Sequence, residues 1–315
     1  MEKKYIYLST PMRSNEIALG VTSLDLSSQR LAEIPWELQL LHSLTDLNLS
    51  NNMLIRIYRL PDLLSLNISN NNIRKLEGLS IRLQTLKASG NVISSMEGLQ
   101  LCADLRFLEM ANNHLEKISH LHRCTKLQHI GLALNKIPDI SPLKACPLLQ
   151  SIDISFNRTK LEGLEQLEHW PRLKRLELTS CQLTFLPPLH HTSLEYLAAS
   201  YNPLTALPQP PDSLRSLYLS GTKIKEVPFM PGLEVLELWS QEEVRLTTMA
   251  SSLRRLVLGS TSLSYKQLDA LLPRYLEHFS VRDPTNATLQ MEEYVNSGKR
   301  RKKAMVVEFL SAAFY

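Results

Sequence analysis

The chain is poor in glycine and contains no glycine-rich loop. Only 10 of its 315 residues are glycine, and none follows the spacing with which backbone amides surround a phosphate. No Ser/His/Asp or Cys/His set can be assembled from it, and His120, His122 and Cys124 lack a usual zinc spacing. The sequence therefore predicts no enzyme activity, no bound metal and no cofactor.

The chain also lacks the sequence pattern of a signal peptide or a transmembrane segment. Residues 1–20 show neither a long apolar core nor a small-residue cleavage site. The apolar residues 304–315 are too few to span a bilayer, and they include Glu308. We therefore expect a cytoplasmic protein.

The four cysteines do not follow the pattern of a disulfide framework. Cys102, Cys124 and Cys146 are 22 residues apart, and each lies three residues before a leucine, whereas Cys181 has a different position. Free cysteine packs as a small hydrophobic residue, and reduced thiols fit an intracellular compartment. We predict that these cysteines fill the core.

Most of the chain has no excess of either charge. The formal net charge is +4, but residues 299–303 (KRRKK) contribute five positive charges, and Glu308 is the only acid after them. Subtracting these leaves thirty basic and thirty acidic residues in 1–298, so the body has no electrostatic footprint for nucleic acid. The basic run is predicted to be a solvated tail, with a nuclear-import signal or a contact to anionic lipid as alternatives.

What the chain does contain is a repeated eleven-residue pattern. Residues 44–54 read LTDLNLSNNML, which is the pattern L-x-x-L-x-L-x-x-N-x-L, and residues 63–73 repeat it. Matches recur about every 21 residues. They begin at Val21, Leu44, Leu63, Leu83, Leu105, Leu127, Leu149, Leu173, Leu194, Leu214, Leu233, Leu253 and Leu276.

This pattern predicts a stack of thirteen short strands. The two central leucines alternate with other residues, which suits a strand that buries one face, and the asparagine can bond backbone groups in the turn that follows. One repeat cannot bury its own leucines, so the strands of stacked repeats must pair in parallel. We predict an α/β horseshoe-shaped solenoid with a parallel concave β-sheet and an irregular, 3-10 and polyproline convex side.

The segments between the strands change along the chain. Residues 32–43 are predicted to form a helical turn with Trp36 and Leu40 facing the core. Proline fills the connections after Leu173, where it forbids a helix interior, and residues 264–275 are predicted to be helical again. The expected organisation is an N-terminal cap at 1–20, the repeats at 21–283, and a C-terminal cap with the basic tail at 284–315.

The repeated eleven-residue pattern resembles that of the leucine-rich repeat superfamily over residues 21–283. The 22-residue units from Leu83 to Leu173 look like those of regulatory subunits that bind protein phosphatase 1. The short proline-rich units, such as residues 204–228 (LTALPQPPDSLRSLYLSGTKIKEVP), are similar to repeats of secreted bacterial effector proteins. The resemblance implies that the chain is a binding scaffold. The repeat pattern does not specify which partner it binds.

Two clusters on the predicted concave face are candidate protein-binding sites, because side chains that flank the buried strand leucines point there. The middle cluster contains Phe107, Glu109, His129 and Asp153. The later cluster contains the residue types found at binding hot spots: Tyr196, Tyr201, Arg215, Tyr218, Val235, Glu237, Trp239 and Arg255. Residues 240–252 depart from the repeat and are expected to form an irregular loop beside it.

The sequence predicts a non-enzymatic scaffold or adaptor, monomeric on its own, that binds another protein on its concave face. Tyr196, Tyr218 and Trp239 are the expected anchors. One alternative is a regulatory subunit of an enzyme such as protein phosphatase 1, and another is a secreted bacterial effector acting on a host protein. A third is targeting of the chain through residues 299–303.

Overall fold

The chain divides into two compact units in the computed structural model. The N-terminal unit is Met1–Leu173 and the C-terminal unit is Lys174–Tyr315. The structure describes residues 5–9, 14–58, 60–239, 249–259, 272–273, 276–282 and 306–310. Most of the loop predicted at 240–252, most of the helix predicted at 264–275, and the basic run at 299–303 lie outside these residues.

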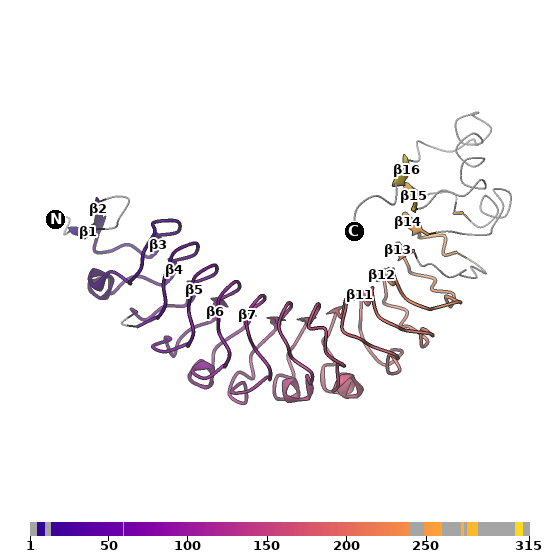
Figure 1. Ribbon diagram of the computed structural model, residues 1–315, viewed down its shortest axis with the longest axis horizontal. Coiled ribbons are helices and arrows are strands. Elements are labelled where there is room, and N and C mark those ends of the chain that lie inside the picture. The colour runs from indigo at the N-terminus through magenta and orange to yellow at the C-terminus, as the bar shows by residue number, and fades with distance from the viewer. Residues whose placement is uncertain are drawn as a thin grey trace. The chain divides into compact units, whose positions relative to one another are not determined.

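Short parallel strands form the sheet of the N-terminal unit. They are β3 (Ser23–Asp25), β4 (Asp46–Asn48), β5 (Ser65–Asn67), β6 (Thr85–Lys87), β7 (Phe107–Glu109), β8 (His129–Gly131) and β9 (Ser151–Asp153). Successive strands pair in register, with Leu47 beside Leu66, for example. Figure 1 shows the labelled strands β3 to β7 along the inner edge of this unit. The predicted parallel sheet is confirmed.

An antiparallel hairpin precedes this sheet. It consists of β1 (Tyr5–Ser9) and β2 (Ser14–Ala18). The hairpin buries Leu8 and Ile17 and leaves Tyr5 and Tyr7 exposed. The division into a cap at 1–20, repeats at 21–283 and a C-terminal segment stays a prediction.

The convex side of the N-terminal unit contains 3-10 helices. They are η1 (Trp36–Leu40), η2 (Leu99–Leu101), η3 (Ser141–Ala145) and η4 (Leu164–His169). The helical turn at residues 32–43 is present, but the prediction that Trp36 and Leu40 face the core is wrong, since they are 62% and 41% exposed. Leu38 and Leu41 are buried instead, because residues three apart share a face of a 3-10 helix.

The C-terminal unit also contains parallel strands. They are β10 (Arg175–Glu177), β11 (Tyr196–Ala198), β12 (Ser216–Tyr218), β13 (Val235–Leu238), β14 (Arg255–Leu258), β15 (His278–Arg282) and β16 (Val306–Leu310). Successive strands again pair in register. No helix occurs among the described residues of this unit, as expected from its prolines. Strand β16 comes from the predicted C-terminal segment and extends the sheet beyond β15.

Asparagine ties neighbouring repeats together, as Asn113 illustrates. Its Nδ2 donates 3.0 Å hydrogen bonds to the carbonyls of Met110, in the same repeat, and Ala88, in the preceding one. Its Oδ1 accepts the amide of Ile93 at 3.0 Å. One buried carboxamide thus satisfies several buried backbone groups. Equivalent bonds form at Asn52, Asn71, Asn91, Asn135, Asn157 and Asn202.

Candidate functional site

Two columns of side chains flank the buried leucines of each sheet. The first column consists of the first residue of each strand, and the second column of the third residue. Parallel pairing in register places equivalent residues of adjacent strands beside one another, so that Tyr196 lies beside Ser216 and Ala198 beside Tyr218. The middle cluster lies in these columns, as do Tyr196, Tyr218, Val235, Glu237 and Arg255 of the later cluster, whereas Tyr201, Arg215 and Trp239 lie outside them.

Arg175, Tyr196 and Tyr218 stack in a row on the C-terminal unit. The guanidinium carbon of Arg175 lies 3.6 Å from the centre of the Tyr196 ring, and the rings of Tyr196 and Tyr218 are 5.1 Å apart. Both tyrosines are half-buried, and desolvation, with a smaller contribution from nearby glutamates, raises the pKa of each phenol. The two rings therefore remain neutral at physiological pH and are already held in place.

An Arg–Glu pair lies near each end of this row. The Nε of Arg175 donates to Oε1 of Glu177 at 2.7 Å, and Nη2 of Arg255 lies 3.2 Å from Oε1 of Glu237. In both pairs the arginine side chain is about twice as exposed as the glutamate. The guanidinium groups are therefore the accessible charges. Sequence reasoning did not select Arg175 and Glu177, although their places in the two columns were a usable signal.

Tyr201 and Trp239 form a separate aromatic pair. Their rings meet edge to face at 5.8 Å. Gly221 lies under the Tyr201 ring, since a Cβ at this glycine would come within 2.7 Å of Tyr201 Cδ1. Trp239 is the last described residue before 240–248, so most of the predicted loop beside it lies outside the described residues.

Arg215 and Val235 complete the predicted C-terminal cluster. The Nη1 of Arg215 donates to the backbone carbonyls of Asp212 and Gly232, each at 3.1 Å. This guanidinium therefore links two backbone turns, and its place in a binding site stays a prediction. Val235 is half-buried and pairs with Ser216 in the first column.

The middle cluster lies on the N-terminal unit. The rings of Phe107 and His129 are 5.8 Å apart. The Glu109 carboxylate covers Gly131, where a Cβ would meet it at 2.1 Å. Asp153 accepts the amide of Ser155 at 2.9 Å. The structure thus brings Phe107 and His129 together, while Asp153 is engaged in its own turn.

Comparison with known proteins identifies the fold. No protein-family model matches the chain, and no curated protein does. Among solved structures, a leucine-rich-repeat protein of Leptospira interrogans is 22% identical with a TM-score of 0.67, over 92% of this chain and 90% of that one. The chain has the leucine-rich-repeat fold.

Two further structures show the same fold. The internalin InlF of Listeria monocytogenes is 18% identical with a TM-score of 0.60, over 95% of this chain and 84% of that one. YopM of Yersinia enterocolitica is 26% identical with a TM-score of 0.56, over 83% of this chain and 64% of that one. The predicted resemblance to particular repeat subtypes stays a prediction.

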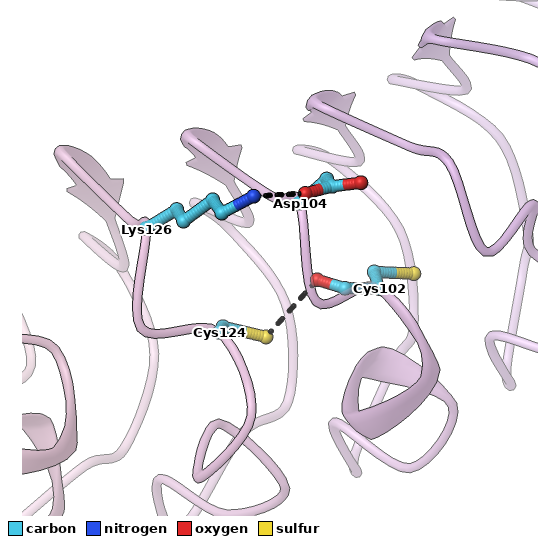
Figure 2. A network of polar contacts seen from close by, with 4 residues as sticks. All are labelled: Cys102, Asp104, Cys124 and Lys126. Carbon is cyan, nitrogen blue, oxygen red and sulfur yellow. Dashed lines mark hydrogen bonds and ion pairs between the residues drawn. The ribbon is translucent and has the colours of Figure 1, made fainter.

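The cysteines of the repeats pack in the core. Cys102, Cys124 and Cys146 are buried and free, and burial raises their thiol pKa values to about 12, 11 and 12. Figure 2 shows the Cys124 thiol donating to the Cys102 carbonyl, below an ion pair between Lys126 and Asp104. Thiols in this state are poor nucleophiles and poor metal ligands.

The described part of the chain contains no group of three or more His, Cys, Asp or Glu residues that could hold a metal ion. Its helices are all too short or too polar to cross a membrane. Leucine-rich-repeat solenoids commonly use their extended sheet face for binding, so the two columns are the surface to consider.

Proposed function

We propose that the chain is a non-enzymatic binding protein whose C-terminal sheet face holds a partner protein. The observation that supports this most is the row Arg175–Tyr196–Tyr218 with an Arg–Glu pair near each end. Tyr and Arg are the residue types that dominate binding energy at interfaces. Here their side chains are held by one another, which lowers the entropy lost when a partner orders them.

The chemistry of this surface suggests what it would contact. The half-buried Tyr196 and Tyr218 rings offer apolar area with a hydroxyl at the edge. Arg175 and Arg255 each keep donors that their glutamates do not use, because a guanidinium has five N–H groups. A protein segment with an apolar side chain between backbone carbonyls or carboxylates would fit this row.

The other predicted residues take secondary places in the proposal. Tyr201 and Trp239 would extend the contact from the turn side of the same unit. Phe107 and His129 would form a smaller contact on the N-terminal unit.

The test is affinity capture with the full chain and with the Tyr196→Ala/Tyr218→Ala variant, followed by mass spectrometry and calorimetric titration of each recovered protein. We expect a partner that binds the variant at least tenfold more weakly, about 1.4 kcal/mol. Phe185→Ala is the matched control, since this aromatic side chain is 71% exposed and lies outside both columns. Equal binding to the Tyr196→Ala/Tyr218→Ala variant would refute the assignment of this face.

A further inference from the structure

A second surface lies at the turn that follows each strand. In the N-terminal unit the eighth residue of every repeat has left-handed backbone geometry, with φ between 53° and 67°, and we call these residues the turn column. Its members are Ser28, Asn51, Asn70, Gly90, Asn112, Leu134 and Phe156.

Two members of the turn column are unusual. Serine, asparagine and glycine accept left-handed geometry readily, whereas bulky side chains rarely do. Leu134 and Phe156 nevertheless have φ values of 57° and 59°. The repeat imposes this geometry, because the Leu134 amide donates to the Ser155 carbonyl at 2.9 Å, just as the Asn112 amide donates to Ala133 at 2.8 Å.

Contacts within the protein cover only part of these two side chains. Leu134 is 50% exposed and Phe156 is 38% exposed. Tyr201, at the same repeat position in the C-terminal unit, is 43% exposed, and its ring packs against Trp239 and over Gly221. Leu134 and Phe156 belong to adjacent repeats, and the hydrogen bond to Ser155 brings the Leu134 backbone beside the residue that precedes Phe156.

The surroundings of the pair carry positive charge. Lys136, Arg158 and Lys160 follow it on the same two turns, and all three are exposed. The acidic residues that follow the pair are Asp139, which accepts hydrogen bonds from Ser141, and the exposed Glu162, so these two turns keep an excess of one positive charge. An apolar pair with a basic rim is complementary to apolar side chains flanked by acidic ones.

We propose that Leu134 and Phe156, with the rim of Lys136, Arg158 and Lys160, bind a segment of a partner protein in which apolar residues are flanked by Asp or Glu. This turn-edge surface belongs to the N-terminal unit and is separate from the Tyr196–Tyr218 row. It can therefore be right or wrong independently of the function proposed above.

The test uses three synthetic pools of twelve-residue peptides and fluorescence anisotropy with the full chain. One pool places two Leu or Phe residues among Asp and Glu, the second replaces the acids with Lys and Arg, and the third replaces the apolar residues with Ala. We expect the acidic–apolar pool to bind at least tenfold more tightly than either of the others. Equal binding of the three pools, or no binding of the first, would overturn the proposal.

Two variants locate the binding. Leu134→Asn/Phe156→Asn introduces the residue that other repeats use at this turn, so we expect at least a tenfold loss of affinity with the unfolding midpoint changed by less than about 5 °C. Lys136→Glu/Lys160→Glu leaves the apolar pair intact and should lose affinity to a similar extent. Phe185→Asn, the same chemical change at an exposed site of the other unit, should bind as the wild type does.

The outcomes separate a binding role from a structural one. A large fall in the midpoint of Leu134→Asn/Phe156→Asn, together with unchanged peptide binding by Lys136→Glu/Lys160→Glu, would show that the pair serves the fold and would overturn the proposal. Unchanged binding by both variants would place any peptide site elsewhere and overturn it equally.

Discussion

The two units share one leucine frame but complete its turns in different ways. In the N-terminal unit six consecutive repeats carry the buried asparagine, from Asn52 to Asn157. In the C-terminal unit the described turns have Cys181, Asn202 and Thr222 at this position, and proline fills the connections. A carboxamide has two donors and an acceptor, whereas a hydroxyl has one donor. The comparison shows that the repeated leucines are common to both units, and it leads us to expect that the turn residue determines how strongly adjacent repeats are joined.

The second column differs between the units in a related way. In the N-terminal unit Asp25, Asn48, Asn67 and Asp153 each accept the amide of a serine two residues later. These side chains stabilise the backbone at the end of the strand, and one acceptor oxygen of each is thereby already used. In the C-terminal unit the column contains Tyr218 and two glutamates that pair with arginines. This difference supports the proposal that the C-terminal unit carries the surface that binds a partner.

The largest expected difference between the units concerns the turn residue. Asn113→Ala removes bonds to Met110, Ala88 and Ile93. The buried Ile93 amide loses its acceptor, which costs about 1–3 kcal/mol, whereas the two carbonyls keep bonds from Asn135 and Asn91 and lose about 0.5–1.5 kcal/mol each. We expect the free energy of unfolding to fall by roughly 3 kcal/mol. Thr222→Ala, which removes one donated bond to Leu219, should cost about 1 kcal/mol. Urea titration of both variants measures the change in the free energy of unfolding. Equal losses would contradict the expected difference between the units.

The stacked thiols should make the N-terminal unit sensitive to alkali. Burial raises the thiol pKa of Cys102 from 9.0 to about 12, so the folded state holds its proton where the unfolded state has lost it. The stability that this provides is present in full below pH 9 and declines as the pH rises toward 12. At pH 10.5 we expect a loss of roughly 2 kcal/mol for this thiol.

The measurement is urea unfolding of the wild type and Cys102→Ala at pH 8 and pH 10.5. The alanine variant starts from a lower stability, because a buried side chain is truncated, but it should lose less between the two pH values. A pH dependence of the wild type that Cys102→Ala fully retains would contradict the prediction.

The smallest expected effect is that of ion pairs between repeats, which both units contain. The Nζ atom of Lys174 lies 2.7 Å from Oε1 of Glu195, and the Nζ atom of Lys126 lies 2.5 Å from Oδ1 of Asp104. All four side chains are about half exposed. Lys174→Met should change the unfolding free energy by less than about 0.5 kcal/mol, and Lys126→Met should leave the thermal midpoint within experimental error. A clear loss of stability in only one of the two variants would contradict the expectation that these ion pairs contribute equally little in both units.

The sequence predicted the repeated parts of this protein well. The spacing of Leu44, Leu47 and Leu49 indicated a buried strand face, and all three are buried. Asn52 was expected to bond the turn, and it does. The exposure of Trp36 was missed, because the helical turn was assigned without knowing that its residues three apart would share the buried face.

The candidate site was predicted only in part. The columns follow from strand alternation, so Tyr196, Tyr218 and Glu237 could be selected from the sequence. Nothing in the linear pattern indicated that the Arg215 guanidinium would bind the carbonyls of Asp212 and Gly232. A long side chain can bond both within its own turn and across to the next repeat, as Arg215 does with Asp212, 3 residues away, and Gly232, 17 residues away.

What the sequence determined by itself is therefore the periodic part of the protein: the parallel strands, their buried leucines and the asparagine turns. These features depend on the spacing of residues within one repeat, and the same spacing recurs from repeat to repeat. Only the tertiary structure decided which exposed residues meet, such as Arg175 with Tyr196, and which residues adopt unfavourable geometry, such as Leu134 and Phe156. The physical reason is that these properties arise between stacked repeats, where side-chain length, direction and charge act across strands rather than along the chain.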